Sequence, residues 1–289
     1  IAYHKEEEEL LKKKAKRSRV KYTQFSKTDK DAVRMAMKMN FGNSTLGDIL
    51  PEQADAKIDI SPSYMANRES FIMGINRKFR DYKDRLLGED ADDDSCEVGS
   101  RVFNLMLHQE LVRDYLNLFT PHRGLLLYHG LGAGKTCSSI AIAEGMKSDK
   151  EIFLLTPASL ETNYLSELKH CGDALYKLDN YWQFLSMNDL KKISANNSDE
   201  YDLETVIKYF AAALSLKPEF IKNNKNPRGG KGGVWLIHKD GQSIDRSHGN
   251  PPMLYDELIK NPAAAKSLNR QLDKMIEAKY RIIHYNGCA

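Results

Sequence analysis

The residues with the clearest chemical meaning stand in the stretch HGLGAGKT, His129–Thr136. A glycine-rich turn that ends in Gly-Lys-Thr and opens a helix curls so that its backbone N–H groups point at bound phosphate oxygens. In such a loop the lysine, Lys135, reaches the β- and γ-phosphates, and the hydroxyl of Thr136 holds Mg²⁺. The predicted nucleoside-triphosphate site, a Walker A loop, consists of Gly130, Leu131, Gly132, Ala133, Gly134, Lys135, Thr136 and Cys137.

The chain departs from the consensus of this loop at one position, where His129 replaces the first glycine. The flanking pattern nevertheless fits. The run LLLYH, Leu125–His129, is apolar and short, as a buried parallel strand is, and KTCSSIAIAEGM, Lys135–Met146, has helical spacing. The alternative, a glycine-rich turn with a chance Lys-Thr, leaves the strand before it and the helix after it unexplained.

A phosphate loop alone does not identify the class of protein, since kinases, GTPases, AAA-type ATPases, packaging motors and helicases share it. Gln109 lies upstream, where helicases and translocases of superfamily 2 place a glutamine whose amide can pair with adenine. Downstream, Thr156, Pro157 and Ser159 follow the predicted strand EIFLLTP, at the place where that superfamily contacts the nucleic-acid backbone. Taken singly, these features could be an exposed helix glutamine and a plain strand-to-helix turn; their joint spacing is more specific.

These motifs stand in a longer stretch that resembles a known family. LMLHQELVRDYLNLFTPHRGLLLYHGLGAGKTCSSIAIAEGM, TPASLETNYLSELKHCGD and YWQF resemble the helicase-like ATPases of nucleocytoplasmic large DNA viruses. GGVWLIHK, KYRIIHYNG and SYMANRESFIMGINRKFRDYKDRL are similar as well. This group is related to the poxvirus early transcription factor small subunit and nucleoside triphosphate phosphohydrolase I. The resemblance extends from about Ser63 to Gly287 and is densest over His108–Asp173.

The resemblance implies a superfamily 2, Swi/Snf-like motor that hydrolyses ATP with Mg²⁺ when bound to DNA, with RNA as the other candidate nucleic acid. It implies a role in viral transcription, at initiation or termination, with viral RNA polymerase or transcription factors as partners. By position, Lys135 and Thr136 carry over as catalytic residues, and Gln109 as the residue that recognises adenine. The location implied is the virion and the viral factory in the host-cell cytoplasm.

One departure from the family pattern concerns hydrolysis. The family has an Asp-Glu-x-His/Asp box at the end of a later strand, where its carboxylates hold Mg²⁺ through water and orient the attacking water. No such box follows the phosphate loop; NNSDEYD and LYDELI do not end a buried strand. We therefore expect an N-terminal fragment that binds ATP and hydrolyses it poorly. We also expect an unpaired, aggregation-prone edge at Leu125–His129, where the missing strands would pair.

The predicted fold is α/β, a P-loop NTPase with the incomplete parallel sheet of a first RecA-like lobe and a helical N-terminal extension, because strand and helix patterns alternate after Arg101. Three regions are predicted. Residues 1–62 form a charged, partly disordered extension, residues 63–100 a helical segment and acidic linker, and residues 101–289 the ATP-binding lobe.

The composition of the chain excludes some classes of protein. No apolar run reaches the roughly 18 residues of a membrane span. The formal net charge is only +3, so any nucleic-acid footprint is local. The four cysteines share no metal-ligand spacing and follow no secretory signal, which predicts reduced thiols in an intracellular protein. Two alternative functions remain open: another P-loop motor, of the packaging or AAA type, and a non-catalytic nucleotide-binding transcription or scaffold factor.

Overall fold

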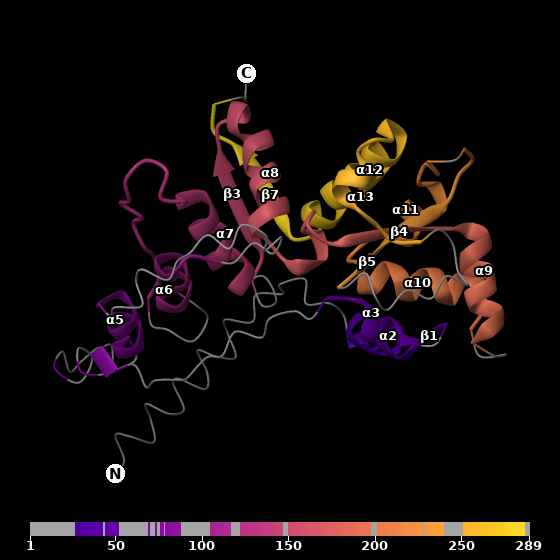
Figure 1. Ribbon diagram of the computed structural model, residues 1–289, viewed down its shortest axis with the longest axis horizontal. Coiled ribbons are helices and arrows are strands. Elements are labelled where there is room, and N and C mark those ends of the chain that lie inside the picture. Colours follow the sequence, from indigo (N-terminus) through magenta and orange to yellow (C-terminus); the bar gives the residue numbers. More distant parts are fainter. Residues whose placement is uncertain are drawn as a thin grey trace, which may run out of the picture.

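The computed structural model combines helices and strands in mixed order, with one pair of parallel strands and two small antiparallel sheets (Figure 1). It describes residues 27–42, 44–51, 69, 73, 76–77, 79–87, 105–116, 122–146, 150–197, 201–227, 229–239 and 251–286. Residues 1–26 of the predicted charged extension and the acidic linker predicted before residue 101 lie outside these residues. Among the described residues, no helix combines the length and the apolarity that crossing a lipid bilayer requires.

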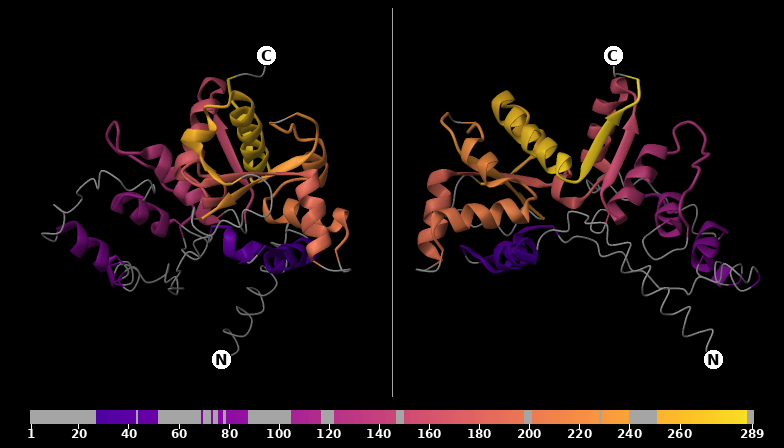
Figure 2. Two further views of the ribbon diagram at one scale, coloured as in Figure 1. Left: turned by 45° about the vertical axis from the view of Figure 1, so that its right-hand side comes forward. Right: turned by 180° about the vertical axis from the view of Figure 1, so that it is seen from behind.

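Two parallel strands form the sheet nearest the phosphate loop. Strand β3 (Ile152–Thr156) pairs in register with β7 (Tyr280–His284), and the two lie side by side in all views (Figures 1 and 2). The chain enters β3 from helix α7 (Lys135–Met146) and leaves it through the 3-10 turn η2 (Ala158–Leu160) into helix α8 (Glu161–Cys171). The phosphate loop, β3 and the helices on either side of it are therefore consecutive in the chain.

A three-stranded antiparallel sheet forms the other half of the molecule. Its order is β5 (Gly233–His238), β4 (Tyr181–Ser186) and β6 (Met253–Leu254). All six residues of β5 are buried, because helix α13 (Pro262–Glu277) covers it on one side and helix α10 (Leu203–Ala213) lies on the other (Figure 1). Helix α13 continues directly into β7, so it joins the two sheets.

The outer edge of β5 is closed by a side chain rather than by a strand. Gln271 of α13 accepts the N–H of Trp235 at 2.8 Å and donates to its carbonyl at 2.7 Å. The Trp235 indole donates to Ser267 at 3.1 Å. A buried strand edge would otherwise leave backbone groups unpaired, so these contacts fix α13 on the sheet and remove a site of aggregation.

The N-terminal described segment packs on this half. Helix α2 (Lys27–Lys38) lies against α10, and Asn40 exchanges two hydrogen bonds of 2.8 Å with the side chain of Asn197. Residues that follow α2, such as Phe41, are buried in the common core. The remaining elements of this half are short: β1 (Asn40–Phe41), β2 (Ser44–Thr45), α3 (Leu46–Ile49), η3 (Ala174–Tyr176), α9 (Met187–Asn196), α11 (Pro218–Asn223) and α12 (Tyr255–Leu258).

Several expectations from the sequence are confirmed and others are wrong. The predicted helix Lys135–Met146 (α7) and the predicted strand in EIFLLTP (β3) are present, and helices and strands alternate along much of the chain after Arg101, as predicted. The expectation of one parallel sheet holds only for β3 and β7, because β4 pairs with β5 and β6 in antiparallel fashion. The predicted buried strand at Leu125–His129 is wrong: none of the described strands pairs with this segment, and much of it is exposed. The domain boundaries remain predictions.

Candidate nucleotide-binding site

The glycine-rich loop has the backbone of a phosphate-binding turn. Gly132 and Gly134 have φ angles of +80° and +66°, a region that favours glycine because it has no Cβ. The first intrahelical bond after the loop runs from the Ser138 N–H to the Gly134 carbonyl at 2.9 Å. Backbone N–H groups before Ser138 therefore precede the hydrogen-bond ladder of α7, and they can bind an anion at the positive end of the helix dipole.

Lys135 lies across this loop. Its ammonium group donates to the carbonyls of Gly130 at 2.7 Å and His129 at 3.1 Å. A Cβ built on Gly130 or Gly132 would meet nothing within 4 Å, so space is open in front of the loop. Phosphate oxygens entering that space could replace the two carbonyls as acceptors for Lys135.

Helix α6 (Leu107–Tyr115) holds the loop from behind. His108 Nε2 donates to the Ala133 carbonyl at 3.0 Å, and its ring packs edge-on against that of His129 with centroids 5.6 Å apart. Gln109 donates through Nε2 to the Gly134 carbonyl at 3.3 Å and accepts the Met106 N–H at 3.0 Å. These contacts attach α6 to the loop at two consecutive carbonyls.

Gln109 is only 2% exposed, and its amide contacts the backbone of the loop at Gly134. Its predicted role as the residue that recognises adenine stays a prediction. The sequence reasoning missed the contact between Gln109 and the loop, and it missed His108 altogether. The available signal was their adjacency: two side chains with hydrogen-bonding groups precede a glycine loop that leaves its carbonyls unpaired.

The two residues after Lys135, Thr136 and Cys137, differ in burial and in bonding. Thr136 is half-buried, and its carbonyl accepts the Ser139 hydroxyl at 2.7 Å. The Cys137 side chain is buried and joined by a disulfide to Cys171 at the end of α8. The expectation of reduced cysteines is therefore wrong for this pair, because packing of α7 on α8 brings two residues that are 34 apart in sequence to a Cα–Cα distance of 5.5 Å.

The predicted nucleic-acid residues lie at the carboxyl end of β3. Thr156 is buried, with its hydroxyl 3.4 Å from the Pro157 carbonyl, whereas Ser159 is exposed in η2. Ser159 does not cap the following helix, because it lies in η2 and α8 begins at Glu161. Asn286, just after β7, accepts the Ala158 N–H at 3.0 Å and so ties together the ends of the two parallel strands.

The far end of α7 carries a half-buried carboxylate, that of Glu144, which two tyrosines share. Tyr280 of β7 donates to Glu144 Oε1 at 2.6 Å, and Tyr176 of η3 donates to the same oxygen. Burial, followed by the negative charge of Glu144, raises the pKa of both phenols well above 10. The tyrosines therefore stay protonated as donors, and they anchor α7 to β7 and η3.

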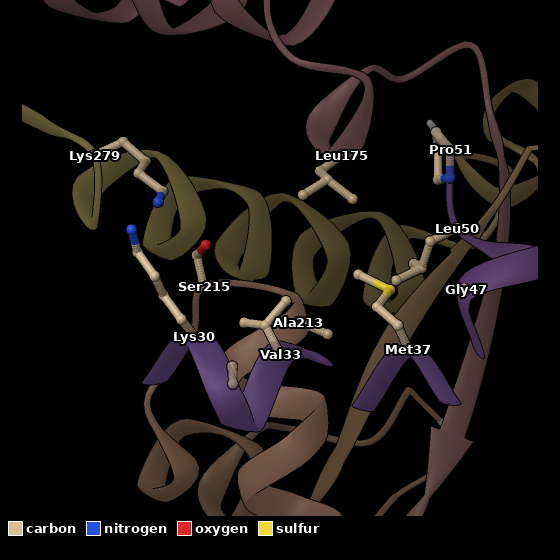
Figure 3. A pocket seen from close by; sticks show the side chains of 11 residues that line it. Lys30, Val33, Met37, Gly47, Leu50, Pro51, Leu175, Ala213, Ser215 and Lys279 are labelled. Atoms are coloured by element: carbon tan, nitrogen blue, oxygen red, sulfur yellow. The ribbon is translucent and has the colours of Figure 1, made fainter. Parts of the chain in front are cut away.

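A cavity of about 450 Å³ lies apart from the loop (Figure 3). Its apolar lining includes Val33, Met37 and Leu50, and the side chains of Lys30 and Lys279 point toward each other at one end. None of its lining residues belongs to the glycine loop, so we do not assign it to the nucleotide site.

Comparison with known proteins identifies relatives that are helicases by name. A "Putative ATP-dependent RNA helicase" of Acanthamoeba polyphaga mimivirus is 41% identical over 100 residues, 34% of this chain and 16% of that protein. A "Putative helicase" of Invertebrate iridescent virus 3 is 34% identical over 119 residues, 35% of this chain and 12% of the relative. A "Putative helicase" of Frog virus 3 is 31% identical over 121 residues, 40% of this chain and 13% of the relative.

The chain thus spans no more than 16% of the length of these curated relatives. Neither a protein-family model nor a solved structure matches it. The similarity supports a helicase-like ATPase of large DNA viruses, and the mixed fold with its parallel strand pair is compatible with a P-loop NTPase.

Proposed function

We propose that this chain is the ATP-binding part of a helicase-like motor of a large DNA virus. The observation that carries the proposal is Lys135 at the first position of α7, with its ammonium group lying across a loop whose glycines have positive φ. That is the arrangement in which a phosphate loop receives β- and γ-phosphates. The helicase names of the relatives support a motor over the other P-loop proteins.

The residues of the loop fit ATP with Mg²⁺. Open space in front of Gly130 and Gly132, the N–H groups at the start of α7 and the charge of Lys135 suit a triphosphate. Thr136 offers a hydroxyl oxygen, a ligand type that Mg²⁺ accepts. The metal would offset phosphate charge, and the chain would orient the nucleotide.

Beyond nucleotide binding, we assign the complete protein to superfamily 2, Swi/Snf-like, with DNA as the favoured nucleic acid and viral transcription as the process. Exposed Ser159 and the backbone around Pro157 are the proposed contacts to nucleic-acid phosphates, since both follow the carboxyl end of β3. Buried Thr156 supports this turn from within. Viral RNA polymerase or transcription factors are the proposed partners, and the virion and viral factory the proposed location.

Slow hydrolysis by this chain is part of the proposal. The acidic residues of LYDELI, Asp256 and Glu257, lie in helix α12, which follows the two-residue antiparallel strand β6 rather than a buried strand. A carboxylate beside the γ-phosphate is what orients the attacking water in P-loop ATPases.

The test compares Lys135→Ala with Lys191→Ala, a matched change at an exposed lysine of α9. We expect the first to weaken binding of a fluorescent ATP analogue with Mg²⁺ by at least about tenfold, as loss of a charge-assisted contact predicts. The second should leave it unchanged, and both should retain binding to a DNA duplex. Full nucleotide affinity in Lys135→Ala would refute the assignment.

A further inference from the structure

We propose that the Cys137–Cys171 bond is a reversible redox latch that sets the affinity of the glycine loop for ATP–Mg²⁺. This inference rests on the proposed function, because it names a means of regulating the same site. It assigns a role to a cysteine pair that nucleotide binding itself does not require.

The position of the bond carries the inference. Cys137 follows Thr136 directly and lies in the first turn of α7, the turn that begins with Lys135. Cys171 is the last residue of α8, the helix that continues from β3. The bond thus fastens the start of the phosphate-binding helix to the element beside it.

Other contacts between these two helices near the loop are weaker. The Ser139 and Tyr164 hydroxyls lie 3.3 Å apart, at the long end of the range for such a hydrogen bond. Glu167 Oε2 lies 3.6 Å from Cys137 Sγ and 3.7 Å from Cys171 Sγ, so after reduction each thiol could donate only a weak hydrogen bond to it. Reduction therefore removes the strongest attachment of the first turn of α7 to α8.

A metal site is the other chemistry open to this cluster, since Cys137, Glu167 and Cys171 offer ligand atoms within 4.8 Å of one another. A structural zinc site needs four ligands, with each sulfur bonded to the metal. Here the two sulfurs are bonded to each other, and within the described part of the chain the cluster supplies three residues. Because a sulfur held in a disulfide is not a thiolate ligand, the bond excludes zinc from the oxidised chain, and a metal is an alternative for the reduced chain alone.

The exchange is balanced with a low-molecular-weight disulfide as oxidant. One cysteine sulfur attacks it, a mixed disulfide forms and one thiol leaves. The second cysteine then attacks the protein-bound sulfur, and the second thiol leaves. Two electrons pass from the protein to the oxidant, and the two thiol protons end on the released thiols. A small dithiol runs the same steps in reverse.

The bond acts on binding through preorganisation. Phosphate binding requires the N–H groups of the first turn and the Thr136 hydroxyl to hold one arrangement, and ordering them opposes binding. With Cys137 fixed to α8, part of that ordering precedes the ligand. The oxidised chain should bind ATP–Mg²⁺ more tightly than the reduced chain, by about fivefold or more, the usual size of such coupling.

The experiment uses the whole chain in two redox states. Oxidised glutathione or a phosphine reductant sets the state, peptide mapping after alkylation locates the bond, and titration with a fluorescent ATP analogue and Mg²⁺ gives the dissociation constant. Cys171→Ser should show the weaker, reduced-state affinity under both conditions. Cys288→Ser, which removes a thiol elsewhere in the sequence, should keep the redox response.

Distinct outcomes overturn distinct claims. Equal affinity in both states with the bond mapped would overturn the latch and leave the proposed function standing. Binding in neither state would overturn both. Absence of the bond after oxidation, or a zinc ion retained by the reduced chain in native mass spectrometry and lost with Cys171→Ser, would overturn the latch in favour of free thiols or a metal site.

Discussion

Two glycines of the phosphate loop that look equivalent in the sequence differ in what surrounds them. Gly134 has a φ of +66°, and a Cβ on it would lie 2.3 Å from Gln109 Nε2. Gly130 is not among the positive-φ glycines, and a Cβ on it would meet nothing within 4 Å. The close approach at Gly134 exists because the Gln109 amide bonds to its carbonyl. One glycine is therefore required by the structure, and the other is not.

We predict that Gly134→Ala weakens ATP–Mg²⁺ binding by about tenfold or more and lowers the free energy of unfolding by about 1–3 kcal/mol, the cost of a strained backbone residue. The new Cβ displaces Gln109 and with it the link between α6 and the loop. Nucleotide titration and urea unfolding measure the two effects. Gly130→Ala is the matched control for stability and should change the free energy of unfolding by far less, because its Cβ meets no neighbouring atom; equal losses of stability in the two variants would show that the contact with Gln109 is unimportant.

The site shows what can be predicted at the residue scale and what cannot. The need for glycine, Lys135 and Thr136 follows from phosphate chemistry, so the motif is sufficient to locate the loop. Support from His108 and Gln109 depends on where α6 lies, which is a tertiary property. The Cys137–Cys171 pair is hidden for the same reason, since only the packing of α7 on α8 brings the two residues together.

At the scale of elements, α7 is held at both ends. Its first turn is bonded to α8 through Cys137, and its last turn is held by β7 and η3 through Glu144. The sequence predicts the helix itself, because its apolar spacing and the preceding glycine are local signals. Its anchors are distant in the chain, so the local pattern does not reveal them.

The shared carboxylate predicts a stability change in alkali. The pKa of Tyr280 is raised by burial and by Glu144, so the folded chain keeps this proton above pH 10 while the unfolded chain loses it. Through this group, the free energy of unfolding therefore does not change with pH below pH 10. Above pH 10 it falls as pH rises, by about 1.4 kcal/mol per pH unit for each such tyrosine.

We expect Tyr280→Phe to lower the free energy of unfolding at pH 8 by about 1 kcal/mol, through loss of the hydrogen bond to Glu144. The same variant should lose less stability than the wild type between pH 10 and 11.5. Urea unfolding at each pH measures both, with exposed Tyr285→Phe as the control. An identical alkaline slope in wild type and Tyr280→Phe would contradict the argument.

At the scale of elements, strand pairing is the feature that was predicted wrongly from the sequence. The runs at Leu125–His129 and at β5 are both short and apolar, and they are indistinguishable by pattern. β5 is buried because β4 pairs with it and Gln271 closes its edge, whereas none of the described strands pairs with Leu125–His129. Strand pairs form between distant segments, so neither this difference nor the antiparallel order of the second sheet follows from composition.

At the scale of the whole molecule, apolar surface is unevenly distributed. The half built on the antiparallel sheet buries most of its large apolar side chains, including Trp182 and Phe210. Around the loop and the parallel strands, large apolar side chains are exposed: Leu126, Tyr128, Leu131, Phe153, Leu155, Ile283 and Tyr285. Exposed apolar patches of this kind mark surfaces that bury themselves against other protein.

This distribution predicts that the chain associates with itself when it is alone in solution. Light scattering after gel filtration should show an average mass that rises with protein concentration. Leu126, 85% exposed, and Leu155, 64% exposed, are the positions to change, since most of each residue faces solvent. The double variant Leu126→Glu/Leu155→Glu should remain monomeric, because burying two carboxylates in a self-contact costs far more than the apolar contact gains.

Met35→Glu/Ile259→Glu introduces the same charge at exposed apolar positions on α2 and just after α12, and it should associate as the wild type does. A wild-type chain that stays monomeric across the concentration range, or a control that is rescued equally, would show that the surface around the parallel strands does not drive association.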